Sequence, residues 1–579
     1  MPYDVIIGRN KEDKKDLGER GLIDIGKGYV QMGQYTSLSN RILMDVAKSH
    51  VVLVAGKRGC LTEDTLVFTD KGYKKIIDFD NKEDKVLSFN KETEKFEWEK
   101  AELLEYAVEE DLIKIEFENG KELKLTSEHP LLKNENKKLN WEKACKLKIG
   151  DKIVCTNDNK NIKYTFINDI SHVEDIKRVY DLSVDKNHSF IANGIISHNS
   201  GKSYTLGVLA EELSDLPEPI NNNIASIIFD TMGIYWTMKY KNEKDKSLLD
   251  KWNLKSKELP VKIFVPFGFY EKYTSQGIPV DKSFALDPSE LNAEDWIITF
   301  GLDLTNPVSV IIERTINKLK EKGSFSISEI IENINKDETT SQETKNAAIG
   351  LFESANTWGI FSNDKKNSTK ISDLINAGKT TIIDLSVYNS IGALNVRGLV
   401  INLISRKIFN QRMADRRVEE IKSVSSGLNY FSSASNQEKK ENPLVWIFID
   451  EAHEFLPLDK KTVATDALVQ LLREGRQPGI SLVLATQQPG QIHRDVMTQS
   501  DIVISHRVTN HYDLQALNYI MQSYVFKGLK KYMDELPGLK GSAIILDDNS
   551  ERIYSLRMRP RFTWHGGEAP SAVSKEKEL

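Results

Sequence analysis

HVVLVAGKRG at residues 50–59 and SGKSYTLGVLAEEL at residues 200–213 are the two stretches that decide the fold of this chain. The first contains a β-branched run typical of a buried parallel strand, and the second continues as a helical pattern. Placed end to end, they read strand, G-x-x-x-x-G-K-S, helix, which is the context that a phosphate-binding loop requires. The sequence therefore predicts one such loop, interrupted between Gly59 and Ser200 by an insert.

The joined loop predicts a site for ATP. Its backbone N–H groups would surround the phosphates, and the positive end of the following helix would face the same anion. Lys202 would reach the β- and γ-phosphates, and the Ser203 hydroxyl would ligate Mg²⁺. The residues predicted to bind the nucleotide are Gly56, Lys57, Arg58, Gly59, Ser200, Gly201, Lys202, Ser203 and Tyr204.

An acidic pair follows a second apolar run, WIFIDEAH at residues 446–453. Asp450 would hold Mg²⁺ through its water shell, and Glu451 would orient the attacking water. Burying two acidic residues at a strand end without a metal or a base would be costly, which favours a catalytic role over a structural one.

A third motif completes the pattern expected of an ATPase. Gln487 directly follows the strand-like run ISLVLAT at residues 480–486, where it could sense the γ-phosphate. Arg473 and Arg476 precede the same run, and either could stabilise transition-state charge from a neighbouring subunit. A single arginine is more often a solvated surface group, so only the ordered set supports this interpretation.

Strand-like runs alternate with helical patterns outside the insert, which predicts an α/β fold with a mostly parallel sheet covered on both faces. The insert reads as many short strands, and LSNRILMDVAKS before the loop reads as a helix. The predicted parts are an N-terminal segment with the first strand (1–59), the all-β insert (60–199), the core continued (200–239), a mainly helical subdomain (240–375), the core with its catalytic motifs (376–558) and a C-terminal tail (559–579).

Composition describes an ordinary globular chain, with 40% hydrophobic and 28% charged residues. The net charge of −6 comes from the insert, and the rest of the chain is balanced, so contact with DNA would need a local basic lining. No apolar run approaches a membrane span, and the polar N-terminus argues against a secretory signal, so we expect a cytoplasmic protein without a membrane partner. The three cysteines form no CxxC pair, so the sequence supports neither a disulfide framework nor a zinc site.

The host chain, meaning everything outside the insert, resembles the HerA family of DNA translocases, within the HerA/FtsK group of ring-forming motors. The stretches that carry the resemblance are MGQYTSLSNRILMDVAKSHVVLVAGKRG, SGKSYTLGVLAEEL, IIFDTMGIYWTMK, FIDEAHEFLP, REGRQPGISLVLATQQP and RPRFTWHGG. The resemblance implies a RecA-like ATPase that forms a hexameric ring on double-stranded DNA in repair or end processing. It also implies that Lys202 binds phosphate, Glu451 is catalytic and Arg476 acts on the next subunit, which RPRFTWHGG would brace.

One departure concerns the N-terminus. Family members carry an N-terminal β-barrel associated with the nuclease NurA, whereas a short and largely polar stretch precedes the loop here. We therefore expect the barrel to be absent or reduced, which weakens the case for a NurA-type partner. Two other interpretations of the host stay open, namely another motor of this group that pumps DNA or moves a different polymer, as in conjugation, and a ring-forming nucleotide switch that does not translocate. FIDEAH also suggests a DEAH-box helicase, but the second motor lobe of that class is not visible.

The ends of the insert suit self-removal without a cofactor. Cys60 can attack its own preceding carbonyl and convert the Gly59–Cys60 amide to a thioester. The Ser200 hydroxyl can then take the acyl group, and Asn199 can cyclise to cut the Asn199–Ser200 bond. These steps need adjacent ends, because much of the barrier is overcome by positioning.

The last residues of the insert predict a hairpin. Asn193-Gly194 between two apolar runs is a strong signal for a two-residue turn. Counting outward pairs Ala192 with Ile195, which sets His188 opposite Asn199, with His198 directly before it.

This insert resembles a mini-intein of the Hint fold. CLTEDTLVFT, TSEHPLL, WEKACKLKIGDKIV and VYDLSVDKNHSFIANGIISHN carry the resemblance, and no homing endonuclease fits between residues 133 and 176. By this resemblance Thr126 and His129 polarise the Gly59–Cys60 bond, Asp181 assists proton transfer, and His188 and His198 assist Asn199. A Hint domain that cleaves without ligating is the alternative.

Overall fold

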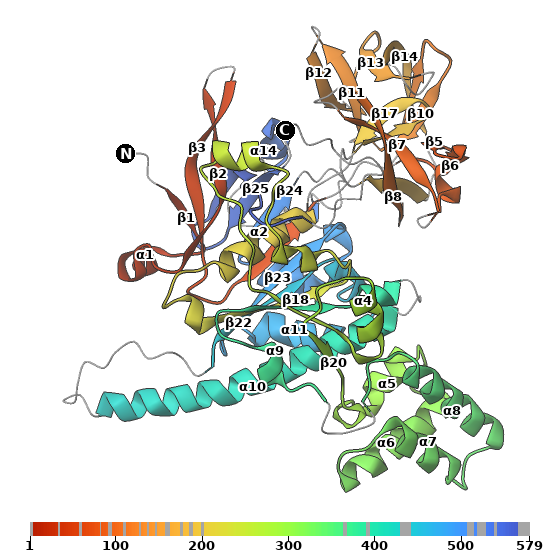
Figure 1. Ribbon diagram of the computed structural model, residues 1–579, viewed down its shortest axis with the longest axis vertical. Helices are drawn as coiled ribbons and strands as arrows, with labels where there is room; N and C mark the ends of the chain where they lie inside the picture. Colours follow the sequence, from red (N-terminus) through yellow and green to blue (C-terminus); the bar gives the residue numbers. More distant parts are fainter. Residues whose placement is uncertain are drawn as a thin grey trace.

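The computed structural model describes most of the chain, and the parts it describes are residues 4–32, 35–56, 61–80, 83–90, 95–107, 112–126, 129–135, 138–144, 147–156, 162–173, 178–184, 189–198, 202–362, 368–389, 394–428, 442–506, 515–517, 529–537 and 541–565. They form two separate sheets (Figure 1). One hydrophobic cluster contains only host residues, and two smaller ones contain only residues of the insert. The predicted class, an α/β fold with an all-β insert, is confirmed.

The host sheet is parallel at its centre. Its order is β1-β3-β2-β26-β25-β24-β4-β23-β22-β18-β21-β19-β20, and every pairing from β24 through β20 is parallel. The central strands are β4 (Val51–Ala55), β18 (Ile224–Asp230), β21 (Thr380–Asp384), β22 (Leu444–Ile449), β23 (Ile480–Thr486) and β24 (Ile502–His506). These apolar runs are buried almost throughout, as expected of parallel strands covered on both faces.

The helical subdomain is smaller than the predicted range of 240–375. Strands β19 (Lys262–Pro266) and β20 (Lys282–Phe284) fall within that range and extend the host sheet beyond β21. Short apolar runs do not distinguish strands from helices by periodicity alone, which explains the difference. The helices that pack together beside the sheet are α5 (Ala293–Thr299), α6 (Pro307–Lys322), α7 (Ile327–Asn335) and α8 (Gln342–Asn356).

The stretch before the loop also differs from its prediction. LSNRILMDVAKS was expected to be helical, but most of it belongs to strand β3 (Tyr35–Asp45), which pairs with β2 (Leu22–Met32). The strand is favoured over a helix here because pairing with β2 leaves Ile42 and Met44 buried. β2 joins the host sheet through β26 (Arg552–Met558), while β1 (Val5–Ile7) pairs with β3 and is followed by α1 (Lys11–Leu17). The described part of this region thus extends the host sheet and forms no barrel of its own.

The described part of the insert is built mainly from antiparallel strands, and it includes a 3₁₀ turn at Ile76–Asp78. Every described pairing within it is antiparallel. The strands are β5 (Leu66–Thr69), β6 (Gly72–Lys75), β7 (Lys85–Asn90), β8 (Lys95–Ala107), β9 (Leu112–Phe117), β10 (Glu122–Leu125), β11 (Pro130–Glu135), β12 (Lys138–Lys143), β13 (Lys152–Cys155), β14 (Lys163–Val173), β15 (Arg178–Val184), β16 (Ser189–Ala192) and β17 (Ile195–His198).

No helix in the described part of the chain combines the length and the apolar character needed to cross a membrane. The longest is α10 (Leu394–Leu428), which carries charged residues along much of its length.

Candidate functional site

The two halves of the predicted phosphate loop approach the host sheet from different parts of the chain. Gly56 directly follows β4 and is buried, and α2 (Lys202–Ser214) begins the second half. α2 packs against β4 and its neighbour β23. Lys57 to Cys60 and Asn199 to Gly201 lie outside the described residues, and so do the side chains of Lys202 and Ser203, so their predicted roles stay predictions.

The acidic pair follows β22 as predicted. Asp450 is 2% exposed, and the backbone N–H of Glu451 donates to its Oδ1 at 2.9 Å. Glu451 has φ +50° and ψ +45°, a left-handed conformation that is uncommon for residues other than glycine. Such conformations persist where the surrounding structure enforces them, and they concentrate at functional sites.

Gln487 connects the acidic pair to the neighbouring strand. Its Nε2 donates to Oε1 of Glu451, because β22 and β23 lie side by side in the sheet. His453 Nδ1 lies 3.6 Å from Oε2 of Glu451 and 3.3 Å from the hydroxyl of Thr486. The predicted catalytic acid, Glu451, is therefore held by Gln487, which directly follows the adjacent strand β23.

The two candidate arginines differ in their partners. Arg473 is 60% exposed and forms an ion pair with Asp495, its Nη2 lying 2.7 Å from Oδ2. Arg476 is also exposed, and its Nη2 donates to the neutral amide oxygen of Gln499 at 3.0 Å. Arg473 thus has a charged partner within the chain, whereas the partner described for Arg476 is neutral, and the predicted role of either arginine on another subunit stays a prediction.

Sequence reasoning missed a second acidic pair beside the first. Asp230 ends β18 and Asp384 ends β21, and the two are partners in the parallel register. Burial and the nearby Asp384 carboxylate raise the pKa of Asp230 to about 7, and burial raises that of Asp384 as well. Tyr235 links this pair to the predicted Mg²⁺ residue, because its backbone N–H donates to Oδ2 of Asp230 at 2.8 Å and its hydroxyl lies 3.5 Å from Oδ2 of Asp450. Its signal was present in the sequence, since both residues end apolar strands, as Asp450 does.

Within the insert, backbone pairing gathers the predicted splicing residues. Leu61, which follows Cys60, exchanges two backbone hydrogen bonds of 2.7 Å with Tyr180 and forms a bridge with Leu125. The residues after these two partners are Asp181 and Thr126. The start of the insert therefore lies between two strands that carry predicted catalytic residues.

The end of the insert reaches the same place. Leu131 pairs with Ser197, which brings His129 near the strand that ends in His198. His129 is fully buried, and its backbone N–H donates to the carbonyl of Thr126 at 3.0 Å. Residues 185–188 and 199–200, including His188, Asn199 and Ser200, lie outside the described residues, as does the side chain of Asp181.

The predicted hairpin is present with the predicted register. Ala192 pairs with Ile195 and Ser189 with His198, and Asn193 and Gly194 have φ of +47° and +79°. Positive φ at both central residues is what a type I′ turn needs, and Asn-Gly supplies it. The predicted pairing of His188 with Asn199 lies outside the described residues and stays a prediction.

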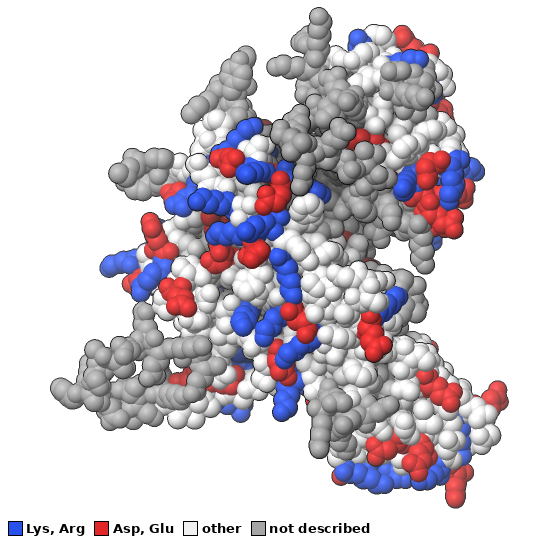
Figure 2. Space-filling view, in the orientation of Figure 1, with Lys and Arg blue, Asp and Glu red and all other residues white. Residues whose placement is uncertain are grey.

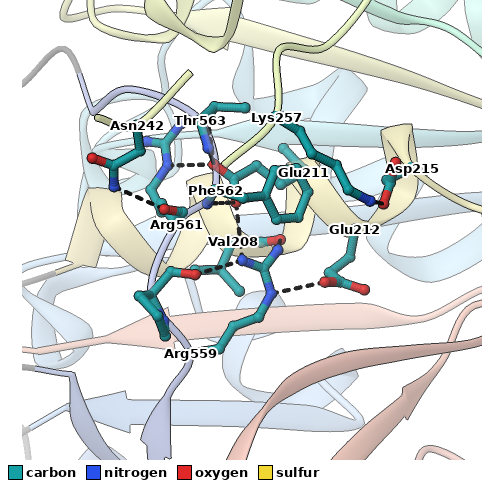
Figure 3. A network of polar contacts seen from close by, with 12 residues as sticks. Val208, Glu211, Glu212, Asp215, Asn242, Lys257, Arg559, Arg561, Phe562 and Thr563 are labelled. Atoms are coloured by element: carbon teal, nitrogen blue, oxygen red, sulfur yellow. Dashed lines mark hydrogen bonds and ion pairs between the residues drawn. The ribbon is translucent and has the colours of Figure 1, made fainter. Parts of the chain in front are cut away.

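Residues 559–565 contact α2 of their own chain (Figure 3). The hydroxyl of Tyr204 accepts a hydrogen bond from the backbone N–H of Arg561 at 2.8 Å, so this predicted nucleotide-binding residue directs its side chain to the C-terminal segment. The predicted brace of residues 559–579 to the next subunit stays a prediction, and residues 566–579 lie outside the described part.

The described surface carries mixed charge. Figure 2 shows Lys and Arg interspersed with Asp and Glu on one face of the molecule, which agrees with the balanced composition of the host. This face offers no broad basic field, so any DNA contact there would depend on local groups.

Comparison with known proteins agrees with the geometry of the host site. Residues 200–408 match the family model "Helicase HerA, central domain", and residues 366–518 match the model of the zonular occludens toxin (Zot). The host is a HerA-type chain. The HerA match begins at residue 200, the first residue that the joined loop assigns to the host after the insert.

Two curated HerA proteins resemble parts of the chain. The DNA double-strand break repair helicase HerA of Pyrococcus furiosus is 28% identical over 210 residues, which cover 34% of this chain and 37% of that protein. The probable DNA double-strand break repair helicase HerA of Methanocaldococcus jannaschii is 28% identical over 157 residues, 24% of this chain and 31% of that protein. The chain thus spans about a third of the length of the curated relatives it matches.

Solved inteins are similar to a further part of the chain. The solution structure of the DnaX mini-intein from Spirulina platensis is 29% identical and covers 24% of this chain and 99% of its own, with a TM-score of 0.22.

Proposed function

We propose that residues 60–199 excise themselves and join Gly59 to Ser200, and that the joined HerA-type host is an ATP-driven, ring-forming DNA translocase or helicase acting in repair or end processing. The observation that carries the proposal is the position of the interruption. β4 and α2 pack together in one site, although the chain between them forms a separate core. The chemistry at Cys60, Asn199 and Ser200 would restore the loop between them.

In the host, each described residue would have a distinct task. Glu451, held by Gln487, would orient the water that attacks the γ-phosphate, and Arg476 would reach the site of a neighbouring subunit. Asp450, buried directly after β22, and Ser203 would supply the oxygen ligands that Mg²⁺ prefers. Bound there with ATP, Mg²⁺ would neutralise charge that develops on the phosphates.

In the insert, Thr126 and His129 would act on the bond between Gly59 and Cys60. Thr126 and the buried His129 would polarise the Gly59–Cys60 carbonyl, because Leu61 is paired beside them. Asp181, on β15, would assist proton transfer between the steps, and His198, at the end of β17, would assist the cyclisation of Asn199 together with His188.

The experiment that tests the whole proposal blocks splicing and measures ATPase activity. A full chain with Cys60→Ala and Asn199→Ala should remain unspliced and hydrolyse no ATP, because its phosphate loop stays interrupted. A chain lacking residues 60–199 should hydrolyse ATP, with stimulation that grows with the length of duplex DNA. ATPase activity in the blocked precursor would contradict the split loop, and indifference of the joined chain to DNA would favour a nucleotide switch over a motor.

A further inference from the structure

A buried network of charges fixes α2 to the segment after β26, residues 559–565, which we name the C-terminal clamp (Figure 3). Arg559 and Arg561 are 1% and 0% exposed, and Glu211 is fully buried. Arg559 Nη1 and Arg561 Nε donate to the two oxygens of Glu211 at 3.1 and 2.9 Å. Arg559 Nε also lies 2.7 Å from Oε1 of Glu212. Two arginines and two glutamates thus balance each other in the core.

Backbone groups of the clamp complete the set around Glu211. The N–H groups of Phe562 and Thr563 donate to its two oxygens at 3.2 and 3.1 Å, and the Thr563 hydroxyl donates as well. A buried carboxylate with this many donors is stabilised only while the donors stay in place, because removing one partner leaves an uncompensated charge. The clamp therefore holds α2 as a unit.

The contacts follow one face of α2 from its first turn to its third. The clamp meets the Tyr204 hydroxyl through the Arg561 N–H, and the His565 ring lies 5.3 Å from the Tyr204 ring. The Arg561 guanidinium covers Gly207, where an added Cβ would come within 2.4 Å of Nη1. Positions 204, 207 and 211 share one helical face, so the clamp resists both rotation and sliding of α2.

This arrangement matters because α2 begins two residues after Ser200. The host core is already folded in the full chain, which still contains the insert, with β4 between β23 and β24 and α2 packed beside them. Ser200 is thus attached through the chain to a helix that contacts the clamp. The two residues in each contact are far apart in the sequence, by 348 residues for Glu211 and Arg559 and by 357 for Tyr204 and Arg561. A misplacement of about 1 Å can slow a positioned reaction by about 10²-fold.

We propose that the C-terminal clamp is a positioning element for splicing, which holds Ser200 where it can receive the acyl group. This inference rests on the proposed self-splicing. In the step concerned, the Ser200 oxygen bonds to the carbonyl carbon of Gly59 and the carbon–sulfur bond to Cys60 breaks. The hydroxyl proton passes to the sulfur, and no electrons are gained or lost. The step before it, thioester formation at Cys60, would use the insert's own residues and would not depend on α2.

The test separates these two steps in the full chain. With Arg561→Ala, we expect the joined product to form at least about 10-fold more slowly, while added thiol cleaves at Gly59–Cys60 at the parent rate. Retained thiol cleavage shows that the insert is folded, so general misfolding would not produce this split. Arg561→Lys, which keeps the charge, should recover part of the rate.

Two further variants test whether the clamp affects joining. Glu212 is 19% exposed, and its two oxygens contact Arg559 Nε and the backbone N–H of Asp24. Glu212→Gln keeps a side chain of the same shape, so it should fold and slow joining by a smaller factor than Arg561→Ala. Asp215 follows the same helix and pairs with Lys257 at the surface, so Asp215→Asn is the matched control and should join at the parent rate. Parent-rate joining in both Arg561→Ala and Glu212→Gln would overturn the role of the clamp. A parent chain that never joins would instead overturn the proposed splicing.

Discussion

The host sheet takes strands from both sides of the insert, whereas the insert's sheet takes strands only from within it. β4 precedes the interruption, and both of its neighbours, β23 and β24, come from the far side. The strands of the insert pair with one another, and its hydrophobic clusters contain no host residue. The insert therefore contains the strands and the hydrophobic core needed to fold alone. The host's site, in contrast, forms only when segments from both sides of the insert pack together.

The contrast also extends to how each part holds its ends. In the insert, Leu61 is tied directly to Tyr180 and Leu125 by backbone pairing. In the host, α2 is tied to the C-terminal clamp through side chains. Substitutions in the host should therefore leave splicing by the insert intact, and substitutions in the insert should leave the host's site for ATP hydrolysis intact. Residues that hold α2 are the exception, because α2 leads directly to Ser200.

The largest expected effect separates host catalysis from splicing. Glu451→Gln should lower the kcat of ATP hydrolysis by about 10²–10⁴-fold, because the residue that orients the water loses its charge. Nucleotide binding and the yield of joined product should not change, since the insert supplies its own catalytic residues. Steady-state kinetics measures the kcat and gel analysis measures the yield of joined product. Glu474→Gln is the control, because the Glu474 carboxylate is exposed and accepts a hydrogen bond from Gln470. A splicing defect in Glu451→Gln would break the proposed independence.

The reciprocal substitution lies in the insert. His129→Ala should slow thioester formation by about 10²–10³-fold, the effect typical of losing one group that stabilises developing charge. His172 lies exposed on β14, so His172→Ala is the matched control and should splice normally. The readout is the rate of thiol-induced cleavage at Cys60. Equal rates in the two variants would remove His129 from the proposed mechanism.

The smallest effect concerns host stability alone. His50, just before β4, bonds Asp501 at 2.6 Å and Asp45 at 3.1 Å. Burial by itself would lower its pKa, but these two carboxylates outweigh burial and raise the pKa to about 9. Since the unfolded value is about 6.5, the protonated ring stabilises the host fully below about pH 6.5. That contribution, about 3 kcal/mol, is lost as the pH rises through about 9.

Urea unfolding of the joined host between pH 6 and pH 10 measures this contribution. The parent should lose about 3 kcal/mol relative to His50→Gln across that range. Parallel pH profiles for the two proteins would exclude His50 as the titrating group.

Features set by neighbouring residues were predictable from the sequence. The Asn193-Gly194 turn fixed the hairpin register, because few residues other than this pair adopt positive φ twice in succession. The strands before Gly56 and Asp450 were also predictable, since each is a continuous buried run. The sequence could place these motifs in one site because the carboxyl ends of parallel strands meet at one edge of a sheet.

Features that depend on distant partners were not predictable. β3 resembled a helix until β2 supplied its pairing. Glu211 looked like an ordinary polar residue on an apolar helix, and its role needed Arg559, which is 348 residues away. Asp230 and Asp384 each ended a strand, but only the register of β18 and β21 made them a pair.

If the insert removes itself, the full chain becomes a continuous host, and the mass of the purified product measures this outcome. After expression of the full chain, we predict a protein whose proteolytic peptides include one in which Gly59 is joined to Ser200, together with a free insert of residues 60–199. Recovery of only the intact chain, or of separate fragments that end at Gly59 and begin at Ser200, would contradict the account.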